Sequence, residues 1–152
     1  MPMSERWIEY WMASAELTAT LSKDPSTKVG AVIAHDKYLL GSGYNGFPAN
    51  IPDNANWLAD RPTKYKLVIH AEMNAILNAY KNGHHYEIPS ATMFTTLAPC
   101  PECAKMIAAV GISKVYYKTP PKHLLDPNSE FQTLVHRGLE IFDIAQIEHE
   151  EI

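Results

Sequence analysis

The sequence has few cysteines and no long apolar run, and both shortages narrow the class of protein. Only Cys100 and Cys103 are cysteines among the 152 residues. A bridge between thiols this close would close almost no loop, which excludes a disulfide scaffold and favours a reducing compartment or a bound metal. No stretch approaches the roughly 18 apolar residues of a membrane span, and acids stand where a signal peptide needs apolar residues. We therefore expect a cytoplasmic protein that does not contact membranes.

The chain also lacks an excess of positive charge. It has 13 Lys and Arg against 17 Asp and Glu, which gives a formal net charge of −4. Binding to long nucleic acid depends on clustered cations, so no nucleic-acid polymer is expected as a partner. A small nucleotide needs only a few local cations or amides and stays compatible. With 46% hydrophobic and 20% charged residues, the chain at 1–152 is typical of a single globular domain.

The periodicity of apolar residues predicts alternating helices and strands. Helices are expected at about 5–21, 70–80, 99–110 and 128–136, and strands at 29–34, 38–44, 91–96, 112–117 and 139–143. Proline and asparagine are frequent between residues 46 and 66, which predicts a long loop with a short helix near Trp57. Gly138 is expected to end the last helix, and the acidic tail at 147–152 is unassigned. The alternation predicts a layered α/β domain that starts with a hairpin.

One histidine and both cysteines are positioned to bind a metal. His70 opens one predicted helix, and Cys100 and Cys103 open the next, with a predicted strand between them. Helices that connect strands of one sheet begin at the same edge, so the imidazole and the thiols can converge. A helix N-terminus also stabilises thiolates. One nitrogen and two sulfurs suit Zn²⁺, and three protein ligands leave a coordination position open, as in catalytic zinc sites.

Glu72 adds an acid–base group to this set. It follows His70 by two positions, about 200° around a helix, so both side chains can face a metal only beyond the helix end. From there Glu72 can move protons between water and a leaving group. Taken singly, His-x-Glu is typical of a helix cap, and Cys-x-x-Cys is typical of a metal site, a redox pair or buried thiols. Together, in the order H-x-E…P-C-x-x-C, they match the zinc deaminase signature.

Two further motifs narrow the resemblance. They are Asp-Pro-Ser-Thr-Lys-Val-Gly-Ala at 24–31 and Gly-Tyr-Asn-Gly-Phe-Pro at 43–48. With the zinc motifs at 70–77 and 99–107, the sequence resembles deoxycytidylate (dCMP) deaminases of the cytidine deaminase superfamily over about residues 24–143. The resemblance implies a three-layer α/β/α fold, in which a five-stranded mixed sheet begins with an N-terminal hairpin. It also implies catalytic Zn²⁺ and the hydrolysis of dCMP to dUMP and ammonia, which supplies dUMP for thymidylate synthesis.

The resemblance further implies roles for individual residues. Hydroxide attacks C4 of the cytosine ring, Glu72 protonates N3 and then the departing ammonia, and Asn45 contacts the sugar. The candidates for substrate binding, including the phosphate, are Asn45, Ser26, Thr27, Lys28, Ala71 and Tyr117. Asn45 can instead be part of a simple turn, and Lys28 is equally compatible with a solvated surface position.

Members of this family are typically hexamers that dCTP activates and dTTP inhibits, with Mg²⁺ on the triphosphate. The resemblance places the effector at Gly43, Tyr44, Asn45 and Gly46, and Arg61, Lys64 and Lys66 are candidate cations for it.

The catalytic zinc uses both cysteines, so a second thiolate site is excluded, whereas His84 and His85 form either a metal site or an exposed loop pair. Two alternatives stay open: a deaminase of tRNA adenosine, free cytidine or guanine, and a non-catalytic zinc or Cys-x-x-Cys redox module.

Overall fold

A mixed sheet of five strands forms the centre of the molecule. The structure, a computed structural model, describes residues 2–152. The strands are β1 (Gly30–His35), β2 (Tyr38–Tyr44), β3 (Thr92–Thr95), β4 (Lys114–Tyr117) and β5 (Glu148–Glu151), and they lie in the order β2-β1-β3-β4-β5. Strand β1 pairs antiparallel with both β2 and β3, whereas β3, β4 and β5 are parallel. Strands β2 and β3 therefore run in the same direction on either side of β1.

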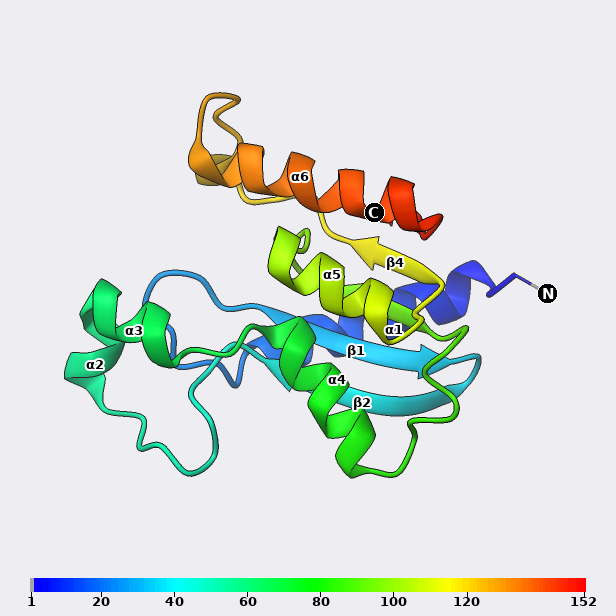
Figure 1. The fold of residues 1–152 in the computed structure, drawn as a ribbon, viewed down its shortest axis with the longest axis horizontal. Helices are drawn as coiled ribbons and strands as arrows, with labels where there is room; N and C mark the ends of the chain where they lie inside the picture. Colours follow the sequence, from blue (N-terminus) through cyan, green and yellow to red (C-terminus); the bar gives the residue numbers. More distant parts are fainter. Residues whose placement is uncertain (1) are drawn as a thin grey trace.

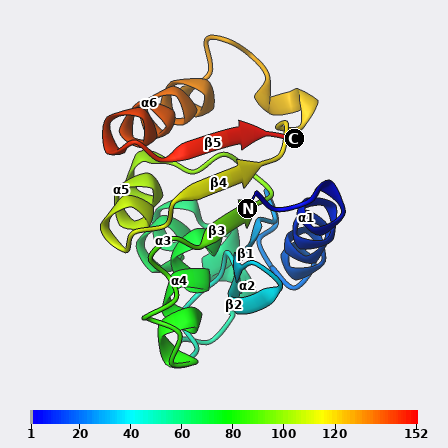
Figure 2. The same cartoon turned by 90° about the vertical axis from the view of Figure 1, so that its right-hand side faces the viewer.

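Helices cover both faces of this sheet. They are α1 (Glu5–Ala19), α2 (Ala55–Ala59), α3 (Arg61–Leu67), α4 (Ala71–Lys81), α5 (Pro101–Ala109) and α6 (Glu130–Ala145), and a short 3₁₀ helix, η1, spans Lys122–Leu124. Helix α1 lies alone on one face, and α4, α5 and α6 lie on the other (Figures 1 and 2). No helix within residues 2–152 has both the length and the apolar character that crossing a membrane requires.

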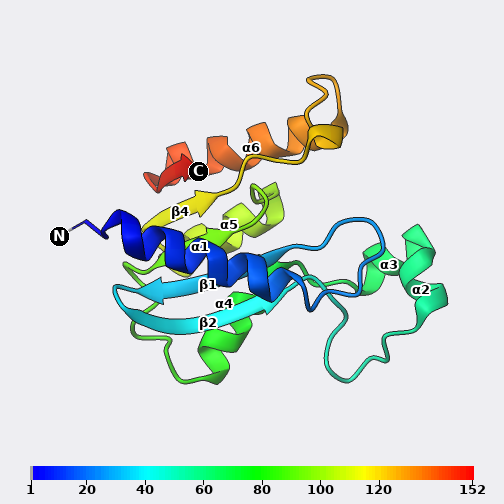
Figure 3. The ribbon, with the colours of Figure 1, turned by 180° about the vertical axis from the view of Figure 1, so that it is seen from behind.

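Two apolar cores join these layers. On one face, Trp11, Met12 and Ala15 of α1 pack against Val32 and against aromatic rings of β3 and β4, and Figure 3 shows α1 lying across the sheet. On the other face, alanines and isoleucines of α4 and α5 pack with Phe142 of α6 over β1, β3 and β4. The predicted three-layer α/β/α arrangement, with five strands and an N-terminal hairpin, is confirmed.

Within the predicted long loop at 46–66, the short helix expected near Trp57 is confirmed as α2, whereas the rest is wrong in part because it contains most of α3. The residues that indicated a loop are caps of these helices. The Asn54 Oδ1 atom accepts hydrogen bonds from the amides of Asn56 and Trp57, and Asp60 Oδ2 accepts one from the amide of Thr63. Pro62 occupies the first turn of α3, where its missing amide hydrogen costs nothing. Turn-forming residues therefore start two short helices here.

The predicted strand at 139–143 is also wrong, because α6 continues through Gly138 to Ala145. Gly138 allows α6 to pack closely and does not end the helix. A Cβ atom at this position would lie 2.3 Å from the carbonyl oxygen of Pro99. The fifth strand is β5 in the acidic tail, where Lys114 of β4 lies 3.5 Å from carboxylates of both Glu148 and Glu150. An exposed edge strand carries little apolar alternation, which is why the sequence pattern missed it.

Gly138→Ala is expected to destabilise the protein, although alanine is normally the better helix former by about 1 kcal/mol. The added Cβ would clash with the backbone of Pro99, and overpacking of this kind costs about 1–3 kcal/mol. Urea unfolding of the variant, with Arg137→Ala on the exposed side of the same helix as control, measures the difference. A gain in stability for Gly138→Ala would contradict the close packing of α6 on the loop before α5.

Candidate functional site

The starts of α4 and α5 meet at one edge of the sheet. The segment that follows β2 and contains α2 and α3 leads to His70, the N-cap residue of α4. Strand β3 leads to Cys100, the N-cap residue of α5. Because β2 and β3 run in the same direction, both helices begin at the same edge. Pro101 in the first turn of α5 presets the helical backbone there, and Cys103 follows on the same helical face.

The structure brings the three candidate ligands together. The Nδ1 atom of His70 lies 3.5 Å from the Cys100 Sγ atom and 3.4 Å from the Cys103 Sγ atom. A tetrahedral zinc ion with ordinary bond lengths separates its nitrogen and sulfur ligands by about 3.6 Å. Within residues 2–152, no other group of three His, Cys, Asp or Glu side chains has this spacing. The donor set and its dimensions therefore fit Zn²⁺.

The electrostatics of the cluster also favour a cation. A hydrogen bond from the Cys103 thiol lowers the pKa of Cys100 to about 4. The Cys100 thiolate in turn raises the pKa of Cys103 and, by its hydrogen bond to the ring, that of His70. Without a metal, the two sulfurs therefore share one proton. Zinc ligands must be deprotonated, so binding of a divalent cation releases that proton.

Glu72 lies in the first turn of α4, and its side chain is buried, with 4% exposure. Its Oε1 atom accepts a hydrogen bond of 3.2 Å from the Thr95 hydroxyl at the end of β3. Burial raises the pKa of Glu72 above its ordinary value of 4.5. A buried carboxyl group whose pKa is raised in this way is suited to general acid–base catalysis.

A pocket of about 340 Å³ opens beside these residues. His70, Glu72 and Cys100 form one end of it. The other walls come from the segment before β1, from α3, and from η1 and α6; their residues include Asp24, Ser26, Thr27, Arg61, Lys64, Leu124, Phe131, Leu134 and Val135. The sequence does not predict that α6 forms a wall of the pocket. The apolar spacing of residues 131, 134 and 135 predicts only that this segment is a helix with one apolar face.

The candidate substrate residues have different places in the structure. Asn45, Ser26 and Ala71 line the pocket. Asn45 braces its wall, because its Oδ1 atom accepts a hydrogen bond from the Val29 amide and its Nδ2 atom donates to the Thr27 carbonyl, both at 2.8 Å. Lys28 is exposed and does not line the pocket. Tyr117 lines a separate hollow, together with Pro120, Leu125 and residues of α6.

The candidate effector residues are also divided. Gly43 packs beneath α4, where a Cβ atom would lie 2.3 Å from the Ala75 amide nitrogen. Tyr44, Asn45 and Gly46 line a pocket of about 120 Å³ together with Lys23, which forms a 2.9 Å ion pair with Asp53. Of the candidate cations, Arg61 and Lys64 line the larger pocket, whereas Lys66 lines neither.

The two neighbouring histidines interact with other side chains and not with each other. The Nδ1 atom of His84 lies 3.2 Å from a carboxylate oxygen of Glu87. The ring of His85 stacks on Tyr80 and contacts Tyr86, with centroid distances of 6.1 Å and 4.2 Å. Within residues 2–152, neither imidazole belongs to a cluster of three potential metal ligands.

Comparisons with known proteins agree with this geometry. Residues 5–119 match the family described as "Cytidine and deoxycytidylate deaminase zinc-binding region". A protein of Aliivibrio fischeri named "Uncharacterized deaminase in luxG 3'region" is 36% identical over 146 residues, which are 96% of this chain and 93% of the relative. Mouse deoxycytidylate deaminase is 42% identical over 123 residues, which are 77% of this chain and 67% of the relative.

A solved structure extends the similarity to the whole fold. It is the dCMP deaminase of cyanophage S-TIM5 in complex with dCMP and dUMP, with a TM-score of 0.80 and 28% sequence identity. The match covers 99% of this chain and 100% of that one. The predicted cytidine-deaminase-like fold is thereby confirmed, and the family description adds zinc binding to the fit of the donor atoms.

Removal of one thiol is expected to abolish tight zinc binding. Wild type should carry about one zinc ion per chain, and Cys103→Ser should lose most of it, because a hydroxyl is a much weaker ligand than a thiolate. Metal analysis after dialysis against a weak chelator measures the content. Glu72→Gln, which leaves all three donors in place, is the control and should keep its zinc. Full zinc occupancy in Cys103→Ser would contradict the ligand set.

Proposed function

The chain belongs to the cytidine and deoxycytidylate deaminase family, and we propose that it is a single zinc-dependent domain that hydrolyses dCMP to dUMP and ammonia. One observation carries the proposal: His70 and Cys100 of the metal cluster and the buried Glu72 line the same pocket as Arg61, Ser26 and Thr27. The metal end suits an amino-pyrimidine, and the cationic end suits a phosphate. The similarity to a dCMP deaminase that was solved with dCMP and dUMP supports this choice of substrate.

The residues have separate tasks in this proposal. His70, Cys100 and Cys103 hold Zn²⁺, which supplies a nucleophile by lowering the pKa of water to about 7. Glu72 takes a proton from the attacking water and gives it to N3 of the ring; it then takes the second proton from the same oxygen and gives it to the leaving amine. One water is consumed and one ammonia leaves, so C4 exchanges an amine for a carbonyl oxygen.

The phosphate binds at the other end of the pocket in this proposal. Arg61 lines that end and forms no ion pair with any residue in 2–152. The hydroxyls of Ser26 and Thr27 line it as well, and both lack a hydrogen-bond partner over the same range. Charged and neutral donors of this kind are the groups that bind phosphate oxygens. Asn45, whose amide braces the same wall, is proposed to contact the sugar.

Glu72→Gln is expected to lose at least about a thousandfold in kcat on dCMP while it keeps its zinc, because an amide cannot exchange protons with water and the substrate. Ammonia release and the absorbance change of the pyrimidine measure turnover. Cytidine, guanine and a tRNA anticodon loop, assayed side by side with wild type, test the alternative substrates. Faster turnover of one of these than of dCMP would reassign the substrate, and the absence of any turnover would favour a non-catalytic zinc module.

We also propose regulation by nucleotides and assembly into a hexamer in the cytoplasm. The pocket at Tyr44, Asn45 and Gly46 is adjacent to the substrate pocket, because Asn45 lines both. Its volume of about 120 Å³ lies below the roughly 300 Å³ of small-molecule sites, and its Lys23 is paired with Asp53. A triphosphate with Mg²⁺ would therefore need groups from a second copy of the chain, which links the effector proposal to the hexamer.

Kinetics on dCMP test the regulatory proposal. The rate is expected to depend sigmoidally on dCMP concentration, to become hyperbolic with dCTP and Mg²⁺, and to fall with dTTP and Mg²⁺, as a shift between two states requires. Sedimentation under the same conditions measures the assembly. Hyperbolic kinetics that neither triphosphate changes would contradict regulation and leave the catalytic proposal intact.

A further inference from the structure

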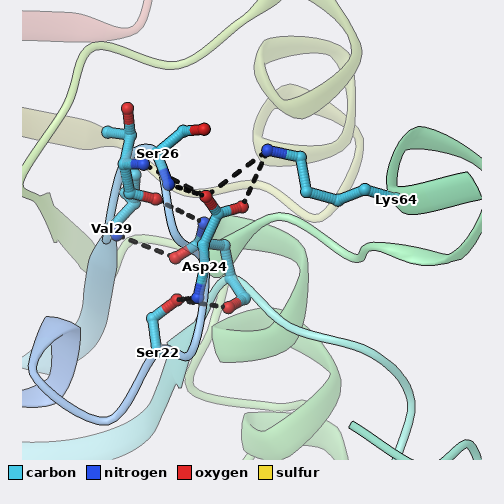
Figure 4. Close-up of polar contacts among 7 residues, drawn as sticks. Ser22, Asp24, Ser26, Val29 and Lys64 are labelled. Carbon is cyan, nitrogen blue, oxygen red and sulfur yellow. Dashed lines mark hydrogen bonds and ion pairs between the residues drawn. The ribbon is translucent and has the colours of Figure 1, made fainter. Parts of the chain in front are cut away.

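A buried ion pair joins two walls of the substrate pocket. The Lys64 Nζ atom lies 3.3 Å from Asp24 Oδ2 and 3.4 Å from Asp24 Oδ1. The two side chains are only 7% and 8% exposed. Lys64 comes from α3 and Asp24 from the segment before β1, so the contact connects two segments that both line the pocket (Figure 4). A buried charge of either sign would be costly without its partner.

The same carboxylate shapes the turn that carries the two free hydroxyls. Asp24 Oδ1 accepts hydrogen bonds from the Ser26 amide at 2.8 Å and from the Thr27 amide at 3.1 Å. The Ser22 hydroxyl accepts a bond from the Asp24 amide and donates to the Asn45 carbonyl, which ties this turn to the end of β2 (Figure 4). The backbone amides of Ser26 and Thr27 are therefore occupied, and within residues 2–152 the hydroxyls are the donors of these two pocket-lining residues that stay unpaired.

The position of Asp24 creates an electrostatic problem for a phosphate. A carboxylate in the wall of a pocket repels a phosphate dianion bound beside it, because charges near protein are screened less than in bulk water. Lys64 removes this repulsion, since its ammonium contacts both oxygens of Asp24. The pair is then neutral, and Arg61 provides the net positive charge at this end of the pocket.

We propose that Lys64 is a positioning residue that gives the site its preference for a phosphorylated substrate by neutralising Asp24, and that it is not itself a phosphate ligand. The inference rests on the proposed function. Asp24 is needed because its carboxylate organises the Ser26–Thr27 turn, and Lys64 makes that carboxylate compatible with a neighbouring anion. An ammonium held by both carboxylate oxygens has little freedom left to follow a ligand.

The test compares dCMP with deoxycytidine, which lacks only the phosphate. The ratio of the two kcat/KM values measures preference for the phosphate and cancels changes at the metal end. Lys64→Met should lower this ratio at least about tenfold, because Asp24 is left as an uncompensated anion. Adding Asp24→Asn, which keeps an oxygen for the two amides, should return the ratio to within about threefold of wild type.

Two results would overturn the inference. If the double variant keeps the low ratio of Lys64→Met, Lys64 contacts the phosphate directly. If Lys64→Met lowers both kcat/KM values equally, the ion pair only stabilises the fold. Zinc content and unfolding temperature are measured for each variant, and Lys81→Met, at an exposed position of α4, is the matched control and should keep the wild-type ratio.

The design also separates this inference from the proposed function. If Lys64→Met does not fold, the double variant, which buries no unpaired charge, decides by itself: a ratio near that of wild type supports the inference and a tenfold loss overturns it. Wild type that turns over dCMP no faster than deoxycytidine would contradict the proposed phosphate recognition, whatever the variants do. Wild type without any deaminase activity would contradict the proposed function and the inference together.

Discussion

The shared direction of β2 and β3 is the constraint on which the site depends. Because both strands run antiparallel to the intervening β1, the helices that follow them start at one edge of the sheet. His70 and Cys100 are the N-cap residues of those helices, and their side chains project beyond the helix ends toward each other. Metal ligands, the acid–base carboxyl group and the pocket all lie at this junction, so the sheet supplies the precision that a catalytic site requires.

Buried charge is concentrated around the pocket and is compensated by specific partners. Glu72 is hydrogen-bonded by Thr95, and Asp24 is paired with Lys64. Within residues 2–152, no buried side-chain nitrogen or oxygen lacks a hydrogen-bond partner. The site therefore contains charged groups that an apolar core would exclude, and it holds them in single positions. Such arrangements reduce stability relative to apolar packing, and they are expected where chemistry needs them.

The errors of the sequence analysis have a common physical cause. Glycine often ends helices, so the sequence predicts a helix end at Gly138. In the fold, α6 continues through Gly138, whose missing side chain allows the helix to lie close to the carbonyl of Pro99. Asn54 and Pro62 indicate a loop by residue type, whereas Asn54 caps α2 and Pro62 lies in the first turn of α3. In both cases the residue type has several local uses, and the use found in the fold is not the commonest one.

Periodicity and residue spacing within short segments were enough to predict the layered α/β class, most of the helices and strands, the zinc-deaminase motif and the family resemblance. The folded structure was needed for the fifth strand, the length of α6, and the placement of Arg61 and Lys64 at the substrate pocket instead of the smaller one. It also revealed the pairing of Lys64 with Asp24. Such features depend on which distant surfaces meet, and packing sets this over the whole chain at once.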